Sequence, residues 1–312
     1  MHDDLLLEEK RMIKRINSTR LQLALMSIPF MLLVFVFNYV PLFGWVMAFV
    51  EYIPGLPITE SKFVGLKYFG QVFSYGTELY TALINSLVLG LLNFLVSPIP
   101  MIVAIMLHEM RRMRVRRSVQ TAITLPNFIS MTIVYAVFFF FFSVDGGLVN
   151  DFLLRIGLIS EPFNLLGNEG ATWVFQTFVL IWKTAGWGAI IYLGAINSID
   201  LQLYDAASVD GAGRFRQVLH VTLPGLMPTF MIMMLLGIGN LLNYNFEQIY
   251  VFHNALVHDK IMTLDYYIYL IGLVKFDFSF STAVGLYKTL VSLVLLFVIN
   301  GVIKKIYGYS II

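Results

Sequence analysis

The sequence predicts an all-α integral membrane protein with six transmembrane helices. Of its 312 residues, 58% are hydrophobic and only 13% are charged. A soluble globular domain is about half apolar and about a quarter charged. Apolar runs of roughly twenty residues also recur along the chain, and a helix of that length crosses about 30 Å of hydrocarbon. Strands of a transmembrane β-barrel would instead alternate apolar and polar residues.

Six apolar segments are expected to form these helices. In chain order they are residues 21–49, 81–107, 119–143, 172–198, 225–246 and 281–303. Proline interrupts the first segment at Pro29 and the second at Pro98 and Pro100. Neighbouring helices in a bundle can satisfy the freed carbonyls, so these prolines are expected to form kinks rather than functional hinges.

Basic residues gather on one side of the expected spans. In chain order they are Lys10, Arg11, Lys14, Arg15, Arg20, Arg111, Arg112, Arg114, Arg116, Arg117, Arg214, Arg216, Lys304 and Lys305. Because loops rich in lysine and arginine stay in the cytoplasm, both termini are expected there. The chain would then comprise a cytoplasmic segment 1–20, a membrane domain 21–303 with a cytoplasmic loop 199–224, and a cytoplasmic tail 304–312. The arginines between the second and third spans can also contact anionic lipid head groups.

Charge and composition exclude several classes of partner. The net charge of +2 is too small to indicate a nucleic-acid partner. The chain has no cysteine, and its five histidines lack the spacing of metal ligands, so neither a disulfide nor a metal site is expected.

Three segments on the opposite side of the membrane are expected to contain short helices. Residues 50–80 include VGLKYFGQVF, a candidate interfacial amphipathic helix. Residues 144–171 include the apolar-periodic VNDFLLRIGL, and residues 247–280 include TLDYYIYLIGL, where Thr263 is expected to cap a helix. None of the three is long enough for an independent domain.

The loop 199–224 carries a fixed spacing of acidic, small and glycine residues. Its order is Asp205-Ala206-Ala207, then Gly211-Ala212, then Val221-x-Leu223-Pro224. This order resembles the EAA loop in the membrane subunits of bacterial ABC importers, whose pattern is EAA, three residues, Gly, nine residues, Ile-x-Leu-Pro. The spacing matches throughout, with Asp205 in place of the usual Glu and Val221 in place of the usual Ile.

This loop is expected to fold as two short helices and to couple transport to a partner. Tyr204 to Val209 reads as a helix, Gly211 as a turn that a β-carbon would hinder, and Phe215 to Val221 as a second helix before Leu223-Pro224 starts the next span. The small alanines leave a low surface that fits a groove. The residues assigned to coupling are Tyr204, Asp205, Ala206, Ala207, Asp210, Gly211, Ala212, Phe215, Leu223 and Pro224. The alternative is an ordinary polar connector.

The resemblance extends over most of the chain, to the permease subunits of carbohydrate importers, especially those for complex oligosaccharides. It is carried by VPLFGWVMAF at 40–49, FVGLKYF at 63–69, TLPNFIS at 124–130, DGGLVN at 145–150, IWKTAGWGAIIYLGAI at 181–196 and AVGLYKTLVSLVLL at 283–296. The resemblance implies a type I ABC importer fold in the bacterial cytoplasmic membrane. It also implies a second permease subunit, two ATP-binding subunits inside, an extracellular solute-binding protein and an oligosaccharide substrate.

The chain itself has no ATPase site by sequence. It contains no GxxxxGKS/T, the loop that cradles phosphates in an ATPase. It is therefore expected to be a transport subunit without catalytic residues or a cofactor of its own. ATP and magnesium would bind to the partner ATPase subunits.

A first candidate for substrate contact lies in the fourth span. Lys183 falls near the middle of the membrane between Trp182 and Trp187. Because charge at that depth is expensive, the lysine is expected to face a polar cavity or a partner group. The aromatic rings would stack on sugar rings while the ammonium pairs with a uronate. The alternative is a structural lysine bonded to helix-end carbonyls or to an acidic group of the partner subunit. A second lysine, Lys288, is expected to snorkel from the last span towards the outer interface.

A second candidate for substrate contact is a polar cluster at the outer half of the fifth span. Its members are Asn240, Asn243, Tyr244, Asn245 and Glu247. These side chains either line the translocation pathway or join helices by hydrogen bonds.

Two other classes of function are alternatives. An ion-coupled secondary transporter is the leading one, but such carriers contain paired repeats and intramembrane carboxylates, and the expected spans contain no Asp or Glu. A membrane-embedded enzyme is the other, yet neither HExxH nor GxSxG occurs in the chain.

Overall fold

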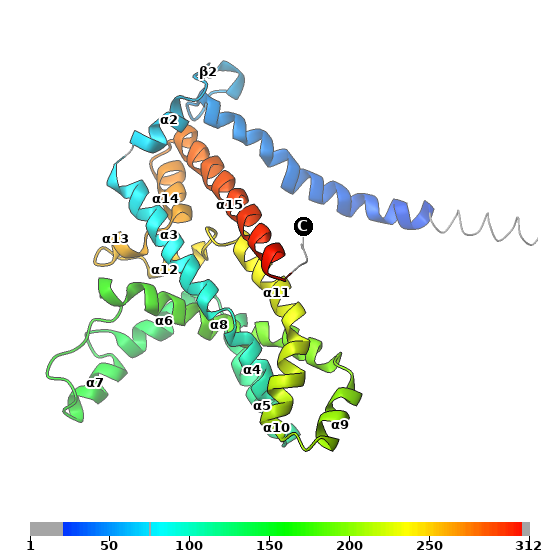
Figure 1. Ribbon diagram of the computed structural model, residues 1–312. Helices are drawn as coiled ribbons and strands as arrows, with labels where there is room; N and C mark the ends of the chain where they lie inside the picture. Colours follow the sequence, from blue (N-terminus) through cyan, green and yellow to red (C-terminus); the bar gives the residue numbers. More distant parts are fainter. Residues whose placement is uncertain (1–20, 75, 308–312) are drawn as a thin grey trace, which may run out of the picture.

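A computed structural model describes residues 21–74 and 76–307, and this part of the chain is almost entirely helical (Figure 1). The expected cytoplasmic segment 1–20 and the end of the expected tail lie outside the described residues. Five helices are long and apolar enough to cross a membrane: Leu21–Phe49, Thr77–His108, Glu169–Asn197, Arg214–Gly237 and Phe278–Val298. A bent pair, Met113–Phe128 and Met131–Phe142, gives up to six spans in this part of the chain.

The bend corrects the expectation of one continuous third span over residues 119–143. The helix axis bends by 107° between the two members of the pair. The first, α5 (Met113–Thr124), tightens into the 3-10 turn η4 (Leu125–Phe128), which contains Pro126. A new helix, α6 (Met131–Phe142), then starts after Ser130, whose hydroxyl accepts a capping bond from Ile133 N at 3.4 Å. A proline and a new N-cap together end one helix and begin another.

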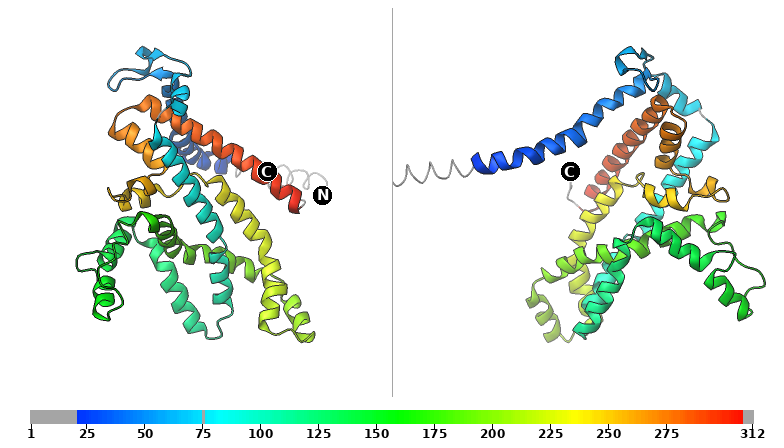
Figure 2. Two further views of the ribbon diagram at one scale, coloured as in Figure 1. Left: turned by 60° about the vertical axis from the view of Figure 1, so that its left-hand side comes forward. Right: turned by 180° about the vertical axis from the view of Figure 1, so that it is seen from behind.

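The first span projects away from the rest of the molecule. In Figure 1 and in the right-hand view of Figure 2 it runs outward from the domain, and its most apolar 18-residue stretch has no buried residue. It is helical through Pro29, contains the π turn η1 (Phe35–Tyr39) and continues as the 3-10 helix η2 (Val40–Phe49). The irregular π turn lies directly before Pro41, whose ring cannot sit against a regular α-helical turn.

The second span consists of α3 (Thr77–Val96) and α4 (Ile99–His108), separated by a turn at Pro98. The expected interruption at this proline is confirmed. Helix α4 packs along α8 (Glu169–Asn197), which also contacts α5. The approach of α8 to α5 is close, since a β-carbon added at Gly186 would lie 2.0 Å from the carbonyl oxygen of Ile123.

Two hydrophobic clusters hold the described helices together. The inner cluster joins α4 and α8 to α11 (Leu223–Gly239), with Leu107, Ala189 and Leu226 at its centre. The outer cluster is larger and joins α3, α6 and α8 to the segments that follow α11, with Tyr267 and Phe280 among its fully buried side chains.

Short elements lie around this larger cluster. They are the antiparallel strands β1 (Val50–Glu51) and β2 (Lys62–Phe63), with η3 (Ile58–Glu60) between them, and the helices α2 (Lys67–Ser74), α7 (Leu148–Arg155), α12 (Phe246–Phe252), α13 (His258–Ile261) and α14 (Leu264–Tyr269), which continues as the π turn η6 (Leu270–Val274). Each of the three expected short helices is present. Thr263 occupies the N-cap of α14 as expected, but its hydroxyl forms no capping bond within the described part of the chain.

Helix α14 lies inside the bundle rather than along its surface. It packs between α3 and α15 (Phe278–Tyr307), as both Figure 1 and the residue contacts show. This position brings the segment after the fifth span back against the last span.

Candidate functional site

The loop 199–224 folds as a helical hairpin at the end of the molecule where α4 and α5 also meet (Figure 1). Its first helix, α9 (Leu201–Val209), begins three residues earlier than expected. Asp200 causes this early start, because its carboxylate accepts a bond from Gln202 N at 2.9 Å and so caps the helix.

The turn of the hairpin is a Schellman motif that requires glycine. Gly211 has φ +76°, a conformation that L side chains rarely adopt. Its N–H donates to Ser208 O at 3.1 Å, and Ala212 N donates to Ala207 O at 2.9 Å. A β-carbon added at Gly211 would meet nothing within 4 Å, so the backbone angle and not lack of space demands glycine here. The expected turn at Gly211 is confirmed.

The second helix of the hairpin runs without interruption into the fifth span. It starts as α10 (Arg214–Gln217), passes through the π turn η5 (Val218–Thr222) and continues as α11. Leu223 is the first residue of α11, as expected, but no break in the helix separates it from the turns before it. The π turn explains how Pro224 is tolerated within a helix, since the wider turn relieves the clash of its ring with the preceding carbonyls.

Side-chain hydrogen bonds join the two arms of the hairpin. Tyr204 Oη and Thr222 Oγ1 are 2.9 Å apart, with Thr222 fully buried. Gln217 Nε2 donates to Ser208 Oγ at 2.9 Å and to Ala212 O at 3.2 Å. The hairpin also touches the preceding loop, where Arg214 lies 4.0 Å from the carboxylate of Glu109.

The surface of the hairpin is unusually apolar for an exposed loop. Val209 is 88% exposed, Phe215 79% and Leu201 75%. The acidic residues Asp205 and Asp210 are exposed beside them. Exposed apolar side chains rimmed by charge are typical of a surface that binds another protein.

Lys183 lies beneath the bend between α5 and α6. Its ammonium donates to the carbonyl oxygens of Pro126 and Asn127, both at 3.2 Å, and to that of Ile129. These carbonyls belong to the end of η4, where the helix stops and only Pro126 O receives a backbone N–H, from Ile129 at 3.2 Å. Of the two interpretations of Lys183, this geometry favours the structural lysine bonded to helix-end carbonyls.

The neighbouring tryptophans pack on opposite sides of the same bend. Trp182 meets Phe138 edge-on with ring centroids 5.6 Å apart, and Trp187 meets Phe128 edge-on at the same separation. Both indoles remain partly exposed, at 36% and 48%. They therefore retain open ring faces on the bundle surface.

The fifth span breaks where the sequence placed a polar cluster on a helix. Helix α11 ends at Gly239, and residues 240–245, here called the polar break, form turns. Asn240 N donates to Gly237 O at 3.1 Å, and Asn243 N donates to Asn240 O at 2.9 Å. The helical placement of this cluster over 225–246 is therefore wrong. Non-helical backbone at membrane depth is tolerated only inside protein or beside a water-filled cavity.

The members of the polar break have different surroundings. The side chains of Asn240 and Asn243 are exposed and linked to each other at 3.3 Å, whereas Tyr244 is buried. Asn245 is the N-cap residue of α12. Glu247, just beyond, accepts a bond from Met131 N at 3.3 Å and so ties α12 to the start of α6.

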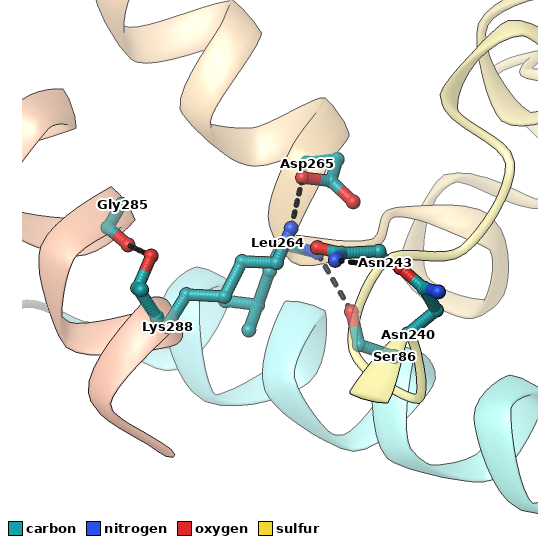
Figure 3. A network of polar contacts seen from close by, with 8 residues as sticks. Ser86, Asn240, Asn243, Leu264, Asp265, Gly285 and Lys288 are labelled. Carbon is teal, nitrogen blue, oxygen red and sulfur yellow. Dashed lines mark hydrogen bonds and ion pairs between the residues drawn. The ribbon is translucent and has the colours of Figure 1, made fainter. Parts of the chain in front are cut away.

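The sequence interpretation missed an ion pair next to the polar break. Lys288 of α15 does not snorkel as expected, because its ammonium bonds the carboxylate of Asp265 on α14 (Figure 3). Leu264 N donates to Ser86 Oγ of α3 at 2.8 Å and fixes the start of α14. An isolated aspartate in the apolar stretch TLDYYIYLIGL and an isolated lysine in the last span were the available signals.

A cluster of aromatic rings beside the polar break was also missed. Phe246 and Tyr250 of α12 face Tyr269 of α14 at centroid distances of 5.3 and 5.6 Å. Phe246 is 37% exposed and Tyr250 51%. Their i, i+4 spacing on α12 puts both rings on one helix face, which the sequence could have revealed. Such rings offer flat apolar faces to a ligand.

Comparison with known proteins places this architecture in a family. Residues 96–307 match the family described as binding-protein-dependent transport system inner membrane component. Two proteins of Bacillus subtilis (strain 168) are similar over 91% of this chain and 88% of their own length. Protein LplB is 38% identical, and the polygalacturonan/rhamnogalacturonan transport system permease protein YteP is 41% identical.

A solved structure shares the fold along nearly the whole chain. It is a bacterial ABC transporter involved in the import of the acidic polysaccharide alginate, and one of its chains matches with a TM-score of 0.83 and 31% identity over 95% of this chain and 99% of that one. The matches confirm the expected fold and give no support to an ion-coupled carrier or a membrane-embedded enzyme. The chain belongs to the family of binding-protein-dependent transport system inner membrane components, as a multi-pass permease subunit of the ABC importer type.

Proposed function

We propose that this chain imports oligosaccharides released from acidic polysaccharides, as one of two permease subunits in an ATP-driven importer. Its location would be the bacterial cytoplasmic membrane, with both termini and the hairpin inside. Support for an acidic sugar comes from the similarity to a polygalacturonan and rhamnogalacturonan permease and to a transporter of alginate. The alginate transporter has also been solved in complex with an alginate pentasaccharide-bound periplasmic protein, which supports a binding-protein partner here.

One structural observation carries the coupling part of the proposal. A single continuous helix joins the exposed hairpin to the polar break, from Arg214 to Gly239. The hairpin presents apolar and acidic side chains to a partner, and the far end of the helix meets polar residues at membrane depth. Movement imposed on the hairpin by an ATP-binding subunit would therefore reach the polar break directly.

The partners supply the chemistry that this chain lacks. ATP and magnesium would bind to two ATP-binding subunits whose surfaces hold a groove for the hairpin. The second permease subunit would complete the translocation pathway. The exposed apolar first span has the length of a membrane crossing and requires lipid or protein around it.

The pathway through this subunit would pass the polar break and the aromatic cluster beside it. Asn240 and Asn243 offer amide groups that hydrogen-bond sugar hydroxyls. Phe246 and Tyr250 offer rings that pack on the apolar faces of sugars. Lys183 acts indirectly in this proposal, since it holds the bend next to Trp182 and Trp187 in shape.

The test is ATP-dependent uptake in proteoliposomes that contain the whole complex. Oligogalacturonides and neutral oligosaccharides of the same length are supplied with the binding protein, and ATP is enclosed. We expect uptake of the acidic sugar only with enclosed ATP, and no ATP hydrolysis by this chain alone. Uptake driven by an ion gradient without ATP would contradict the proposal, as would hydrolysis by the isolated, contaminant-free chain.

A further inference from the structure

A cavity lies where α14, α15 and the polar break come together. Its volume is about 330 Å³, within the range of about 300–1,000 Å³ that is typical of small-molecule sites. Its polar lining consists of Asn243 of the polar break, Asp265 of α14, and Lys288, Thr289 and Ser292 of α15. Ile268, Leu293 and Leu296 supply the apolar part of the lining. Figure 3 shows Asn243 and the Asp265–Lys288 ion pair on neighbouring sides of this region.

The ion pair at this depth needs a reason beyond stability. The side chain of Lys288 is only 10% exposed and that of Asp265 25%. Removing two charges from water costs about as much as their attraction returns, so a buried pair seldom stabilises a fold compared with apolar side chains. Charged residues within membrane bundles face polar cavities and mark substrate pathways. The cavity beside the pair satisfies that condition.

The charges of the cavity cancel. Lys288 contributes one positive charge and Asp265 one negative charge, and the other lining side chains are neutral. A carboxylate entering the cavity would have to displace Asp265 from Lys288 and would leave two negative charges beside one positive charge. Neutral groups meet no such penalty.

Hydrogen-bonding capacity remains on both charged groups. In the described part of the chain, only one oxygen of Asp265 is bonded, and the second points away from Lys288 in Figure 3. Thr289 uses its hydroxyl proton on Gly285 O at 2.9 Å, which leaves its oxygen free to accept. The amide oxygen of Asn243 is likewise without a donor among the described residues. The cavity therefore offers acceptors and ammonium protons close together, so that neighbouring hydroxyl groups of a ligand could each donate one hydrogen bond and accept another.

We propose that this cavity is a subsite for the hydroxyl groups of a sugar ring, in which the neutral Asp265–Lys288 pair binds saccharides without regard to their charge. The inference rests on the proposed function, because it presumes that saccharides pass through this subunit. It assigns the carboxylate groups of an acidic substrate to contacts elsewhere. The anchored start of α14, where Ser86 holds Leu264, keeps Asp265 in place as the ring enters.

The first test replaces both charges together, so that neither is left unpaired. The double variant Asp265→Asn/Lys288→Met is reconstituted as the whole complex, and uptake of an oligogalacturonide is compared with that of a neutral oligosaccharide of equal length. We expect KM to rise about tenfold for both sugars, the loss expected for hydrogen bonds to charged groups. An unchanged KM for both sugars, or a rise confined to the acidic sugar, overturns the proposal.

A charge-swapped variant separates recognition from structure. Asp265→Lys/Lys288→Asp retains an ion pair with the two charges exchanged. If the pair is purely structural, this variant has the wild-type KM. If the cavity instead recognises the positions of donors and acceptors, the swapped variant has a raised KM, as the first double variant does. Recovery of KM by the swap therefore overturns the proposal.

A milder substitution can test the subsite if the double variants do not assemble. Thr289→Val has nearly the same shape and removes only an exposed hydroxyl of the cavity, so assembly is retained. We expect a roughly threefold rise in KM for both sugars, on the order of one neutral hydrogen bond. An unchanged KM overturns the proposal. If wild-type complex takes up neither sugar, the proposed function fails, and that result is recognisable before any variant is made.

Discussion

The hairpin of residues 199–224 and the core built around the outer cluster (the outer core) are held together in opposite ways. In the hairpin the joining contacts are local, such as Gln217 to Ser208, nine residues apart. In the outer core they span most of the chain: Asn85 of α3 donates to Met262 O, 177 residues away. The hairpin exposes its large apolar side chains, whereas the core buries them. The comparison teaches that the shape of the hairpin is set by its own local sequence, while the core depends on the whole fold.

The largest effect is expected at the bend, which belongs to the core. Lys183→Met removes the ammonium from three carbonyl oxygens; Pro126 O keeps its bond from Ile129 N, but Asn127 O and Ile129 O lose their donor, and each buried unsatisfied group costs about 1–3 kcal/mol. We expect little assembled complex and an equal loss of uptake for acidic and neutral sugars. The yield of intact complex from membranes measures this. A well-assembled variant that loses only the acidic sugar would show that Lys183 contacts substrate.

The next effect is expected in the hairpin, where transport fails without loss of protein. Gly211→Val places a branched side chain at φ +76°, where such residues are true outliers. We expect normal amounts of complex, uptake reduced by roughly tenfold or more, and ATP hydrolysis that no longer responds to the loaded binding protein.

A matched control lies two residues along the chain. Gly213 also has no neighbour within 4 Å of an added β-carbon, but its φ is −68°. Gly213→Val should therefore retain most of the uptake. Equal damage from the two substitutions would mean that bulk, and not backbone strain, disturbs coupling.

A smaller effect is expected in the outer core, where a substitution should lower stability without changing the coupling of ATP hydrolysis. Asn85→Ala removes two bonds from Nδ2 to Asp259 O and Met262 O, both 2.9 Å long, and the acceptor for Trp173 Nε1. We expect a loss of about 2–3 kcal/mol in stability, seen as a lower unfolding temperature in detergent. ATP hydrolysis per assembled complex should stay coupled. The hairpin substitution Ser208→Ala should leave the unfolding temperature unchanged.

The smallest effect concerns pH in the outer core. Burial lowers the pKa of His253 below its usual value of 6.5, and the nearby His258 lowers it further. The unfolded chain therefore takes up the proton first as the pH falls, so folded-state stability is present at neutral pH and declines below about 6.5. Unfolding temperatures at about pH 7.5 and about pH 5.5 measure the decline, which His253→Asn should reduce. A His253→Asn variant with the full decline would assign it to other groups.

The same contrast explains what could be predicted from the sequence. The hairpin was predictable because its turn depends on one glycine and its helices on nearby residues. The spans were predictable from hydrophobicity alone. The bend at Ile129 was missed because apolar residues occur on both sides of it, although Pro126 and Ser130 marked it.

The other features that the sequence did not predict depend on contacts between segments far apart in the chain. The polar break lies within GIGNLLNYN, a stretch rich in glycine and asparagine and therefore weakly helical, but only the cavity beside it makes non-helical backbone acceptable there. The Asp265–Lys288 pair joins residues from a loop and a span that no local pattern connects. Lys183 had two interpretations in the sequence, and only the bend beneath which it lies supplied the three carbonyls that decide between them.

The continuous helix from Arg214 to Gly239, roughly 39 Å long at about 1.5 Å per residue, makes the influence between its ends reciprocal. If engagement of the hairpin changes the affinity for sugar at the far end by some factor, occupancy by sugar must change the affinity for the engaged partner by the same factor. A sugar that binds without shifting that equilibrium would occupy the subunit and block transport. Good substrates and inhibitors would then differ in how far their binding shifts the equilibrium of the hairpin towards the engaged state, and not in how tightly they bind.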